Sequence, residues 1–211
     1  MRPVAIVMPT IGAFDAGKVL GEAQATAGIE CYPIIVEDMV RTGFSKTVNR
    51  GLAQVPDGHD VLFLNDDVSG WYEGWLAQLS ETLYSRDDFG LVGPSGDCST
   101  DPMRRWRIGD HGLVSVTHYP FWCALLRREV FDQVGMLDET FIHYASDYDY
   151  CDRIRAAGWL IVWMKEAMLQ HVCGGSGKLQ GWSGHDLSLY MLRRKQRGET
   201  GRWLGPSVSL S

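Results

Sequence analysis

Short apolar runs alternate with helix-forming segments over residues 1–93, and this alternation restricts the fold more than any other feature of the chain. The runs that predict strands are 4–8, 32–36, 61–64 and 89–92. The segments between them that predict helices are 16–27, 44–54 and 71–84. Strands separated by helices form βαβ units, so the pattern predicts an α/β fold with a Rossmann-like sheet that is mixed but mostly parallel and is flanked by helices.

The regular alternation of predicted strands and helices ends at residue 93. Residues 94–112 contain Gly, Pro, Asp and Arg with little apolar periodicity, and they predict a long loop. Further strands are expected at 114–117, 121–126, 160–163 and 167–170, and further helices at 128–134, 146–157 and 186–195. There is no internal repeat and no linker-like composition, so the 211 residues predict a single domain.

Composition excludes several classes of protein. A hydrophobic content of 45% fits a globular chain, and a formal charge of −6 differs from the basic balance of most duplex-binding proteins. Five cysteines without a Cys-x-x-Cys motif argue against a disulfide framework and for a reducing compartment. The amino terminus does not resemble a signal peptide, and no run approaches the roughly 20 apolar residues of a membrane span. We therefore expect a cytoplasmic protein whose contact with a membrane, if it has one, is peripheral.

Two adjacent carboxylates follow the third apolar run. Residues 60–68 read Asp-Val-Leu-Phe-Leu-Asn-Asp-Asp-Val, so Asp66 and Asp67 lie where a buried strand leaves the sheet. Successive side chains of an extended segment point to opposite sides, so one acid can face a sugar hydroxyl and the other a metal ion. Ligands of open α/β sheets bind beyond the carboxyl ends of the strands. The alternative is that residues 65–67 only form a turn.

Other polar residues recur at predicted element ends, which should share one edge of the sheet: Glu37, Asp38, Asp147, Asp149 and His171. The run His171-Val172-Cys173 favours zinc only weakly, because no second Cys or His pair accompanies it. Residues 174–178, Gly-Gly-Ser-Gly-Lys, are similar to a fragment of a phosphate loop but lack the full Walker spacing.

Several segments resemble the family 2 glycosyltransferases of the GT-A fold, and the resemblance runs from residue 4 to about residue 176. The matching segments, in chain order, are 4–10 (VAIVMPT), 43–51 (GFSKTVNRG), 63–68 (FLNDDV), 127–131 with 134–141, and 146–159. Each motif alone is moderately specific, whereas their order and spacing together are specific.

The resemblance implies a nucleoside-diphosphate sugar donor, a divalent metal (Mn²⁺ or Mg²⁺) and transfer with inversion. Asp67 would bind the metal, which neutralises the departing diphosphate, and His171 would complete the metal site. The donor would be bound by residues at the ends of the early strands and in the second helix: Pro9, Thr10, Glu37, Asp38, Asn49, Asn65 and Asp66.

The resemblance also implies that Asp147 is the general base that accepts the proton of the acceptor hydroxyl. An alternative reading is structural, because Ser146 and Asp149 have the spacing of a capping box at a helix start. Family members commonly carry an acid where this chain has Ser146. The absence of that acid removes a negative charge next to Asp147, which eases ionisation of the Asp147 carboxyl group.

Acceptor contacts are expected from the long loop, where Trp106 offers an aromatic face and Arg105 a phosphate partner, and from Asp149. A basic end, made of Arg193, Arg194, Lys195, Arg197 and Arg202, could face anionic lipid, a phosphorylated acceptor or nucleic acid. We expect residues 1–93 to bind the nucleotide sugar, residues 94–180 to form the acceptor and catalytic half, and residues 181–211 to form a helix and tail.

Several alternatives stay open. Ser146 leaves room for a catalytically weak module that binds a nucleotide sugar or glycan, and the basic clusters leave room for a transferase acting on modified nucleic acid. Retention of configuration is a lesser alternative to inversion. The sequence does not specify the sugar or the oligomeric state, and the acceptor could be a glycan, a lipid-linked saccharide, a protein or a nucleic acid.

Overall fold

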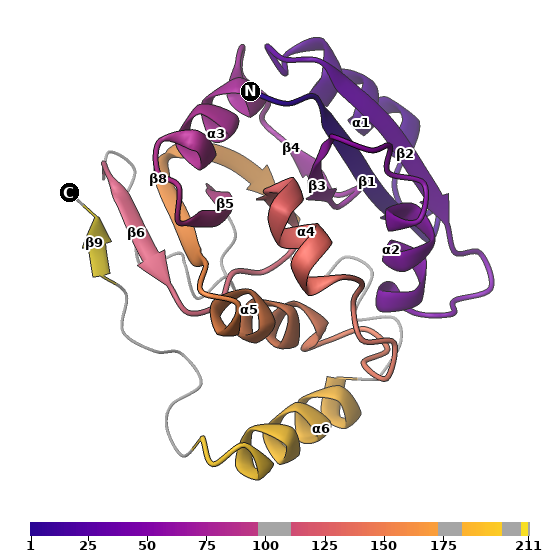
Figure 1. The fold of residues 1–211 in the computed structure, drawn as a ribbon. Helices are drawn as coiled ribbons and strands as arrows, with labels where there is room; N and C mark the ends of the chain where they lie inside the picture. Colours follow the sequence, from indigo (N-terminus) through magenta and orange to yellow (C-terminus); the bar gives the residue numbers. More distant parts are fainter. Residues whose placement is uncertain (97–110, 173–182, 200–207, 211) are drawn as a thin grey trace.

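A computed structural model describes residues 1–96, 111–172, 183–199 and 208–210 (Figure 1). The strands are β1 (Val4–Thr10), β2 (Cys31–Glu37), β3 (Asp60–Leu64), β4 (Val68–Ser69), β5 (Phe89–Gly96), β6 (Leu113–Val116), β7 (Cys123–Leu126), β8 (Leu160–His171) and β9 (Val208–Leu210). The helices are α1 (Ala16–Ala25), α2 (Phe44–Leu52), α3 (Trp75–Tyr84), α4 (Arg128–Val134), α5 (Ser146–Ala156) and α6 (Ser183–Gln196).

The strands form one mixed sheet in the order β2-β1-β3-β7-β5-β8-β6-β9, and β4 pairs with the far end of β8. β1 is parallel to β2 and β3, and β5 is parallel to β8. β7 lies antiparallel between β3 and β5, and β6 lies antiparallel to β8. Most strands thus point in one direction, which confirms the predicted mixed, mostly parallel sheet.

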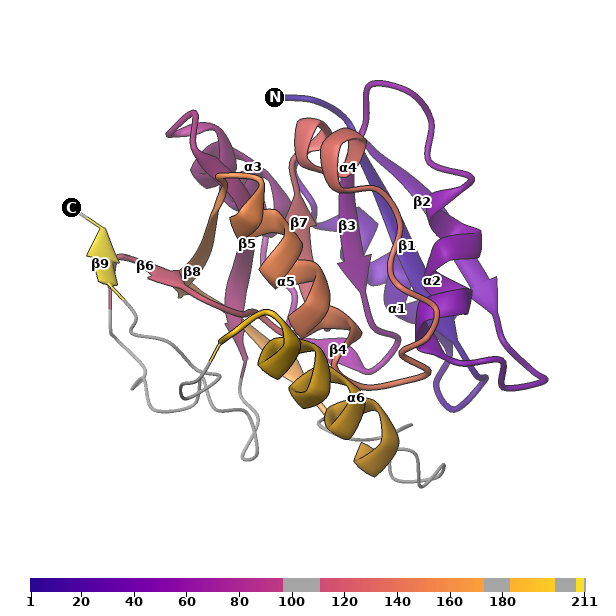
Figure 2. The ribbon, with the colours of Figure 1, turned by 60° about the horizontal axis from the view of Figure 1, so that its bottom comes forward.

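Helices cover both faces of this sheet, which explains why β1, β3 and β7 are apolar along almost their whole length. Figure 2 shows α4 and α5 in front of the central strands and α1 and α3 behind them. The two rear helices are in direct contact, since the Trp75 indole nitrogen donates a hydrogen bond to the Ala23 carbonyl at 3.0 Å. None of the described helices has both the length and the apolar character needed to cross a bilayer.

The predicted boundaries need correction in the second half of the chain. The runs 160–163 and 167–170 belong to one strand, β8, with a bulge where its register with β5 jumps from Met164 to Met168. Polar Lys165 and Glu166 interrupt the apolar pattern at this bulge, which is why the sequence predicted two strands. The predicted loop at 94–112 begins later than expected, because Pro94 still belongs to β5.

Two further differences come from short-range geometry. The helix predicted from residue 71 begins at Trp75, because Gly74 has a φ of 77° and acts as the residue that precedes the first turn. The short strand β4 was not predicted. It forms only because its two residues pair with Gln170 and His171 of β8, a contact between distant parts of the sequence.

Candidate functional site

The carboxyl ends of β1, β2 and β3 meet at one edge of the sheet, as the parallel pairing requires. Thr10, the last residue of β1, donates a hydrogen bond through its hydroxyl to Asp66 Oδ2 at 2.5 Å. The Thr10 carbonyl accepts the backbone N–H of Asp38 at 2.8 Å. These contacts bring together residues of three strand ends, all of which the sequence assigned to donor binding.

Asp66 is buried, and its environment favours the protonated form. Burial is the main reason that its pKa is raised, and the neighbouring charge of Asp67 adds to the effect, whereas the Thr10 hydroxyl opposes it. Two carboxylates held side by side out of water favour a cation or a hydrogen-bond donor between or beside them. This edge is therefore prepared for a ligand that supplies hydroxyl groups or positive charge.

Asp67 and His171 approach each other because β4 pairs with the end of β8. The distance between Asp67 Oδ1 and His171 Nε2 is 3.2 Å. Asp67 Oδ1 is buried and accepts no hydrogen bond from any residue in the described ranges. The imidazole also stacks on the indole of Trp122, with ring centroids 5.0 Å apart and planes inclined by 10°, which fixes its orientation.

The pair fits a divalent cation that is shared with a phosphate ligand. A buried carboxylate oxygen without a donor, facing an imidazole nitrogen, presents two atoms that can coordinate one ion. Within the described residues, no group of three or more His, Cys, Asp or Glu side chains converges. Cations at phosphate sites commonly take only one or two protein ligands and complete their shell with phosphate and water.

Asp147 lies in the first turn of α5. Ala145 precedes the helix in a left-handed conformation, with a φ of 61°, and no side chain caps this end. The alternative reading of Ser146 and Asp149 as a capping box is therefore wrong, because Ala145 and not Ser146 precedes the first turn. Burial raises the pKa of Asp147 to about 6, although the Tyr148 N–H and the charge of His118 oppose the shift.

Tyr150 connects α5 to the strand that carries the acid pair. Its ring is fully buried and packs edge-on against Phe63 of β3, at 6.2 Å between centroids, and against Phe121 at 5.7 Å. Phe63 lies three residues before Asp66, and Tyr150 lies three residues after Asp147. In Figure 2 the first turn of α5 and β4 accordingly lie at the same, lower edge of the sheet.

The segment before Asp147 is held by two contacts that the sequence did not reveal. The buried carboxylate of Asp186 in α6 accepts backbone N–H groups from Ile142, His143 and Tyr144 at 2.7 to 3.1 Å. On the other side, Gly43 has a φ of 111°, and a Cβ there would lie 2.5 Å from the Ile142 carbonyl oxygen. The route of the chain into the first turn of α5 is thus fixed from α6 and from the start of α2.

Asp149 is buried and is occupied by an ion pair within α5. Its Oδ2 lies 3.0 Å from Arg153 Nε, and Arg153 also donates to the Val134 carbonyl at the end of α4. Burial raises the pKa of Asp149, and the Arg153 charge opposes the shift. These contacts give Asp149 a structural role, and nothing in them supports the predicted acceptor contact.

Asp38 and Asn49 also make extensive contacts within the protein. Both carboxylate oxygens of Asp38 accept backbone N–H groups of the following turn, from Thr42 at 2.8 Å and Gly43 at 3.0 Å. Burial would raise the pKa of Asp38, but these hydrogen bonds outweigh it and lower the pKa. The Asn49 amide pairs with the backbone N–H and carbonyl of Leu137, each at 2.9 Å. Both residues thus shape the loops around the edge.

The remaining predicted donor residues lie at the same edge. Glu37 is exposed at the end of β2, and its carbonyl accepts a hydrogen bond from Arg50 at 2.8 Å. Pro9 and Asn65 are half-buried at the ends of β1 and β3, and the Asn65 backbone N–H donates to the Trp122 carbonyl at 2.8 Å. Several residues that the sequence analysis singled out lie outside the described residues: Arg105, Trp106, Cys173, residues 174–178 and Arg202.

The basic end is largely neutralised within the molecule. Arg193 pairs with Asp138 at 2.5 Å, Arg194 pairs with Glu199 at 3.0 Å, and Arg197 pairs with both Asp152 and Glu199. Three of the arginines for which the sequence suggested an anionic partner therefore form ion pairs with carboxylates of the protein itself. Their contacts attach α6 to α5 and to the loop before it.

The chain is similar in sequence to a rhamnosyltransferase and to an O-antigen biosynthesis protein. No family model matches the chain. It is 27% identical to the N-acetylglucosaminyl-diphospho-decaprenol L-rhamnosyltransferase of Mycobacterium tuberculosis, over 97% of this chain and 78% of that protein. It is 26% identical to the O-antigen biosynthesis protein RfbC of Myxococcus xanthus, over 59% of this chain but only 12% of that protein.

Solved structures of GT-A glycosyltransferases share the fold. A mannosyltransferase from Pyrobaculum calidifontis, in complex with GDP-Man and Mn²⁺, superposes with a TM-score of 0.68 at 13% identity, over 96% of this chain and 66% of that one. The glucosyl-3-phosphoglycerate synthase of M. tuberculosis, with Mn²⁺, UDP-glucose and glycerol 3-phosphate, superposes with a TM-score of 0.58 at 12% identity, over 95% of this chain and 82% of that one.

Proposed function

Because the chain is a family 2 glycosyltransferase of the GT-A fold, we propose that it transfers a sugar from a nucleoside-diphosphate donor to an acceptor hydroxyl with inversion. The observation that carries this proposal is the Tyr150–Phe63 contact, which brings the first turn of α5 to the sheet edge that holds Asp66 and Asp67. Residues 1–93 would bind the donor, residues 94–180 would supply the base and acceptor contacts, and residues 181–211 would form the helix and tail.

Asp147 would act as the general base. An inverting displacement needs a group on the acceptor side that takes the hydroxyl proton while the new bond forms. A carboxyl with a pKa of about 6 is ionised at neutral pH yet more basic than an ordinary aspartate, so it suits this role. The activity should therefore fall as the pH is lowered through about 6.

The acid pair would act on the donor. Asp66, held by Thr10 through one oxygen, would accept a hydrogen bond from a ribose or sugar hydroxyl through the other. Asp67 and His171 would hold a divalent cation, and the imidazole favours Mn²⁺ over Mg²⁺. When bound, that cation would supply positive charge to the leaving diphosphate.

The relative from M. tuberculosis suggests the acceptor. Its name describes rhamnosyl transfer to N-acetylglucosamine on decaprenyl diphosphate, and we propose that this chain likewise uses a lipid-diphosphate-linked sugar. The test is a transfer assay with a short-chain prenyl-diphosphate N-acetylglucosamine and a panel of nucleotide sugars that includes an L-rhamnose donor, with Mn²⁺ or Mg²⁺. Product would be detected by mass spectrometry, and NMR would give its anomeric configuration.

The outcomes of that assay separate the alternatives. A metal-dependent product with inverted configuration supports the proposal. Saturable binding of a nucleotide sugar without turnover would instead favour the binding module that Ser146 left open, and a retained configuration would exclude Asp147 as the base of a single displacement. Transfer to a nucleic acid but not to the prenyl acceptor would identify the other alternative.

A lipid-linked acceptor requires access to a membrane surface, and we propose that the outward face of α6 provides it. Leu187, Met191 and Leu192 are 40%, 46% and 53% exposed and lie on the same side of the helix as exposed Lys195.

We expect the chain to cosediment with vesicles containing anionic lipid. A triple variant with Gln at the three apolar positions should lose most of this binding while keeping its melting temperature and its activity on a water-soluble acceptor. Equal cosedimentation of both proteins would contradict the proposal.

A further inference from the structure

A buried tryptophan lies at the sheet edge that carries the proposed metal ligands. Trp122 directly precedes β7 and is only 3% exposed. Its carbonyl accepts the backbone N–H of Asn65 at 2.8 Å, so it stands opposite the residue before the acid pair. Its indole stacks on the imidazole of His171, with ring centroids 5.0 Å apart and planes inclined by 10°. Trp122 thus connects the exit of β3 to the end of β8.

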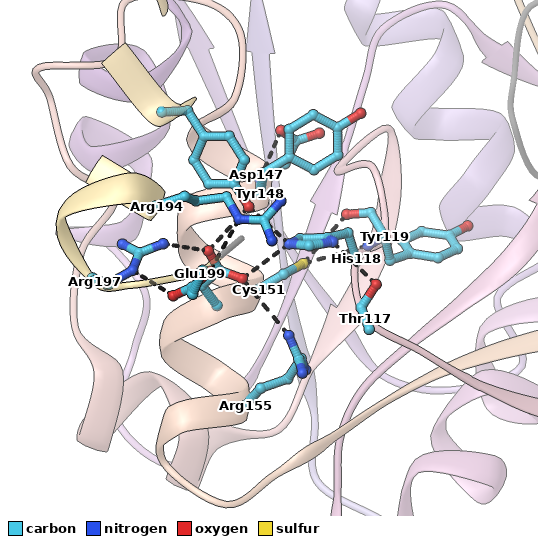
Figure 3. Close-up of polar contacts among 12 residues, drawn as sticks. Thr117, His118, Tyr119, Asp147, Tyr148, Cys151, Arg155, Arg194, Arg197 and Glu199 are labelled. Atoms are coloured by element: carbon cyan, nitrogen blue, oxygen red, sulfur yellow. Dashed lines mark hydrogen bonds and ion pairs between the residues drawn. The ribbon is translucent and has the colours of Figure 1, made fainter. Parts of the chain in front are cut away.

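Contacts with two further elements hold Trp122 in place. At the end of β5, Gly96 leaves room for the indole, since a Cβ there would lie 2.9 Å from Trp122 Cζ2. On the side of α5, the backbone N–H of Tyr119 donates to Cys151 Sγ at 3.4 Å (Figure 3). The segment 119–122 therefore has a fixed position relative to both α5 and the sheet.

Packing, and not hydrogen bonding, holds the indole itself. Trp122 Nε1 is buried and has no hydrogen-bond partner in the described part of the chain. A buried donor without a partner costs free energy, and a phenylalanine would fill much of the same space without that cost. What the indole provides at this edge is therefore a large aromatic face, and the His171 imidazole lies against that face.

The stacked indole determines which way the imidazole points. The pairing of β4 with β8 places the backbone of His171, but backbone pairing does not set the side-chain torsions, and the second torsion of histidine has a broad range. Stacking on a fixed indole restricts the plane of the ring, and in this orientation His171 Nε2 lies 3.2 Å from Asp67 Oδ1. An imidazole that binds a cation also becomes electron-poor, which the electron-rich face of an indole favours.

We propose that Trp122 is a positioning residue for a metal ligand: its indole holds the His171 imidazole in the plane in which Nε2 and Asp67 Oδ1 face the same cation. This inference rests on the proposed metal site at Asp67 and His171. Groups that orient a metal-binding histidine from outside the coordination shell typically contribute roughly 10- to 100-fold to metal affinity. Because stacking restricts the ring without a hydrogen bond, we expect an effect of about tenfold.

The test is a double-mutant cycle in which the dissociation constant for Mn²⁺ is measured by electron paramagnetic resonance. Trp122→Leu should weaken Mn²⁺ binding about tenfold. His171→Gln should weaken it as well, and adding Trp122→Leu to His171→Gln should change the dissociation constant by no more than about twofold, because the imidazole is then absent. Nitrogen modulation in the electron spin echo of bound Mn²⁺ should be present in wild type, weaker in Trp122→Leu and absent in His171→Gln.

Trp75→Phe is the matched control. It also replaces a fully buried indole, but it lies in α3, behind the central strands in Figure 2, and should leave Mn²⁺ binding unchanged. Trp122→Phe is the second variant if Trp122→Leu does not fold. It keeps a smaller aromatic face and breaks no described hydrogen bond, and it should weaken Mn²⁺ binding about threefold when His171 is present and not when His171 is replaced.

Two outcomes would overturn the inference. An equal loss of Mn²⁺ affinity with and without the His171 imidazole would show that Trp122 only supports the sheet edge. An unchanged Mn²⁺ affinity in the folded Trp122 variant would show that the stacking does not orient the ligand. If His171→Gln binds Mn²⁺ as wild type does, the proposed metal site itself is wrong, and this result differs from a site that needs His171 but not Trp122.

Discussion

Asp147→Asn is expected to lower the transfer rate by about 10²- to 10⁴-fold, the usual contribution of a general base, and at the same time to raise the melting temperature. The Asn side chain has the shape of Asp but cannot accept the proton of the acceptor hydroxyl. Binding of the nucleotide sugar should change little, because the donor contacts lie at the ends of β1 to β3.

The gain in stability follows from the direction of the pKa shift. The pKa of Asp147 is about 6 in the folded protein and 3.8 when unperturbed, so the folded state binds the proton more tightly than the unfolded state. Asp147 therefore destabilises the fold above pH 6, and this effect disappears as the pH falls below 4. Removing the charge should stabilise the protein at pH 7.5 by up to about 3 kcal/mol.

Thermal melting of both proteins at pH 7.5 and pH 4.5, together with the transfer assay, checks both parts of this prediction. The difference in melting temperature should be largest at pH 7.5 and should shrink at pH 4.5. Asp132→Asn, which changes an exposed partner of Arg128 in α4, is a suitable control because it lies away from the sheet edge. A variant that melts below wild type at pH 7.5 would show that the carboxylate stabilises the fold, contrary to the expectation.

Asp67→Asn is expected to lower the transfer rate by about 10³-fold. The proposed cation on this residue would stabilise the charge of the leaving diphosphate by several kcal/mol, and the variant would lose this stabilisation. The substitution removes the negative charge that faces His171 but leaves the β4–β8 pairing intact. Asp67 Oδ1 accepts no hydrogen bond within the described part of the chain, so its replacement should cost little stability.

Metal binding can be followed without measuring turnover. Wild type should lower the signal of free Mn²⁺ in electron paramagnetic resonance. A nucleotide sugar added with Mn²⁺ should raise the melting temperature of wild type. A ligand at a hundred times its dissociation constant stabilises the folded protein by roughly 2.7 kcal/mol, which such a melting experiment detects. Both responses should be lost in Asp67→Asn and kept in Asp88→Asn, a control at an exposed ion pair with Arg86. Undiminished Mn²⁺ binding by Asp67→Asn would move the metal site elsewhere.

The sequence was most informative where structure depends on local pattern. The apolar run before Asp66 and Asp67 predicted β3 and its exit, and the helix of residues 128–134 was predicted with the bounds it has. It failed where one element depends on a distant one. The bulge of β8 follows from its register with β5. Ala145 takes a left-handed conformation before α5, where the sequence left a capping box open as an alternative.

By itself, the sequence determined the order of strands and helices, the edge at which the acids lie and the resemblance to a family, because periodicity and element ends are properties of neighbouring residues. Only the tertiary structure decided which side chains meet there. The approach of Asp67 to His171 depends on β4 pairing with β8, and the path of residues 142–144 into α5 depends on the Asp186 carboxylate of α6. Such contacts arise from the packing of segments far apart in the chain, and no local pattern records them.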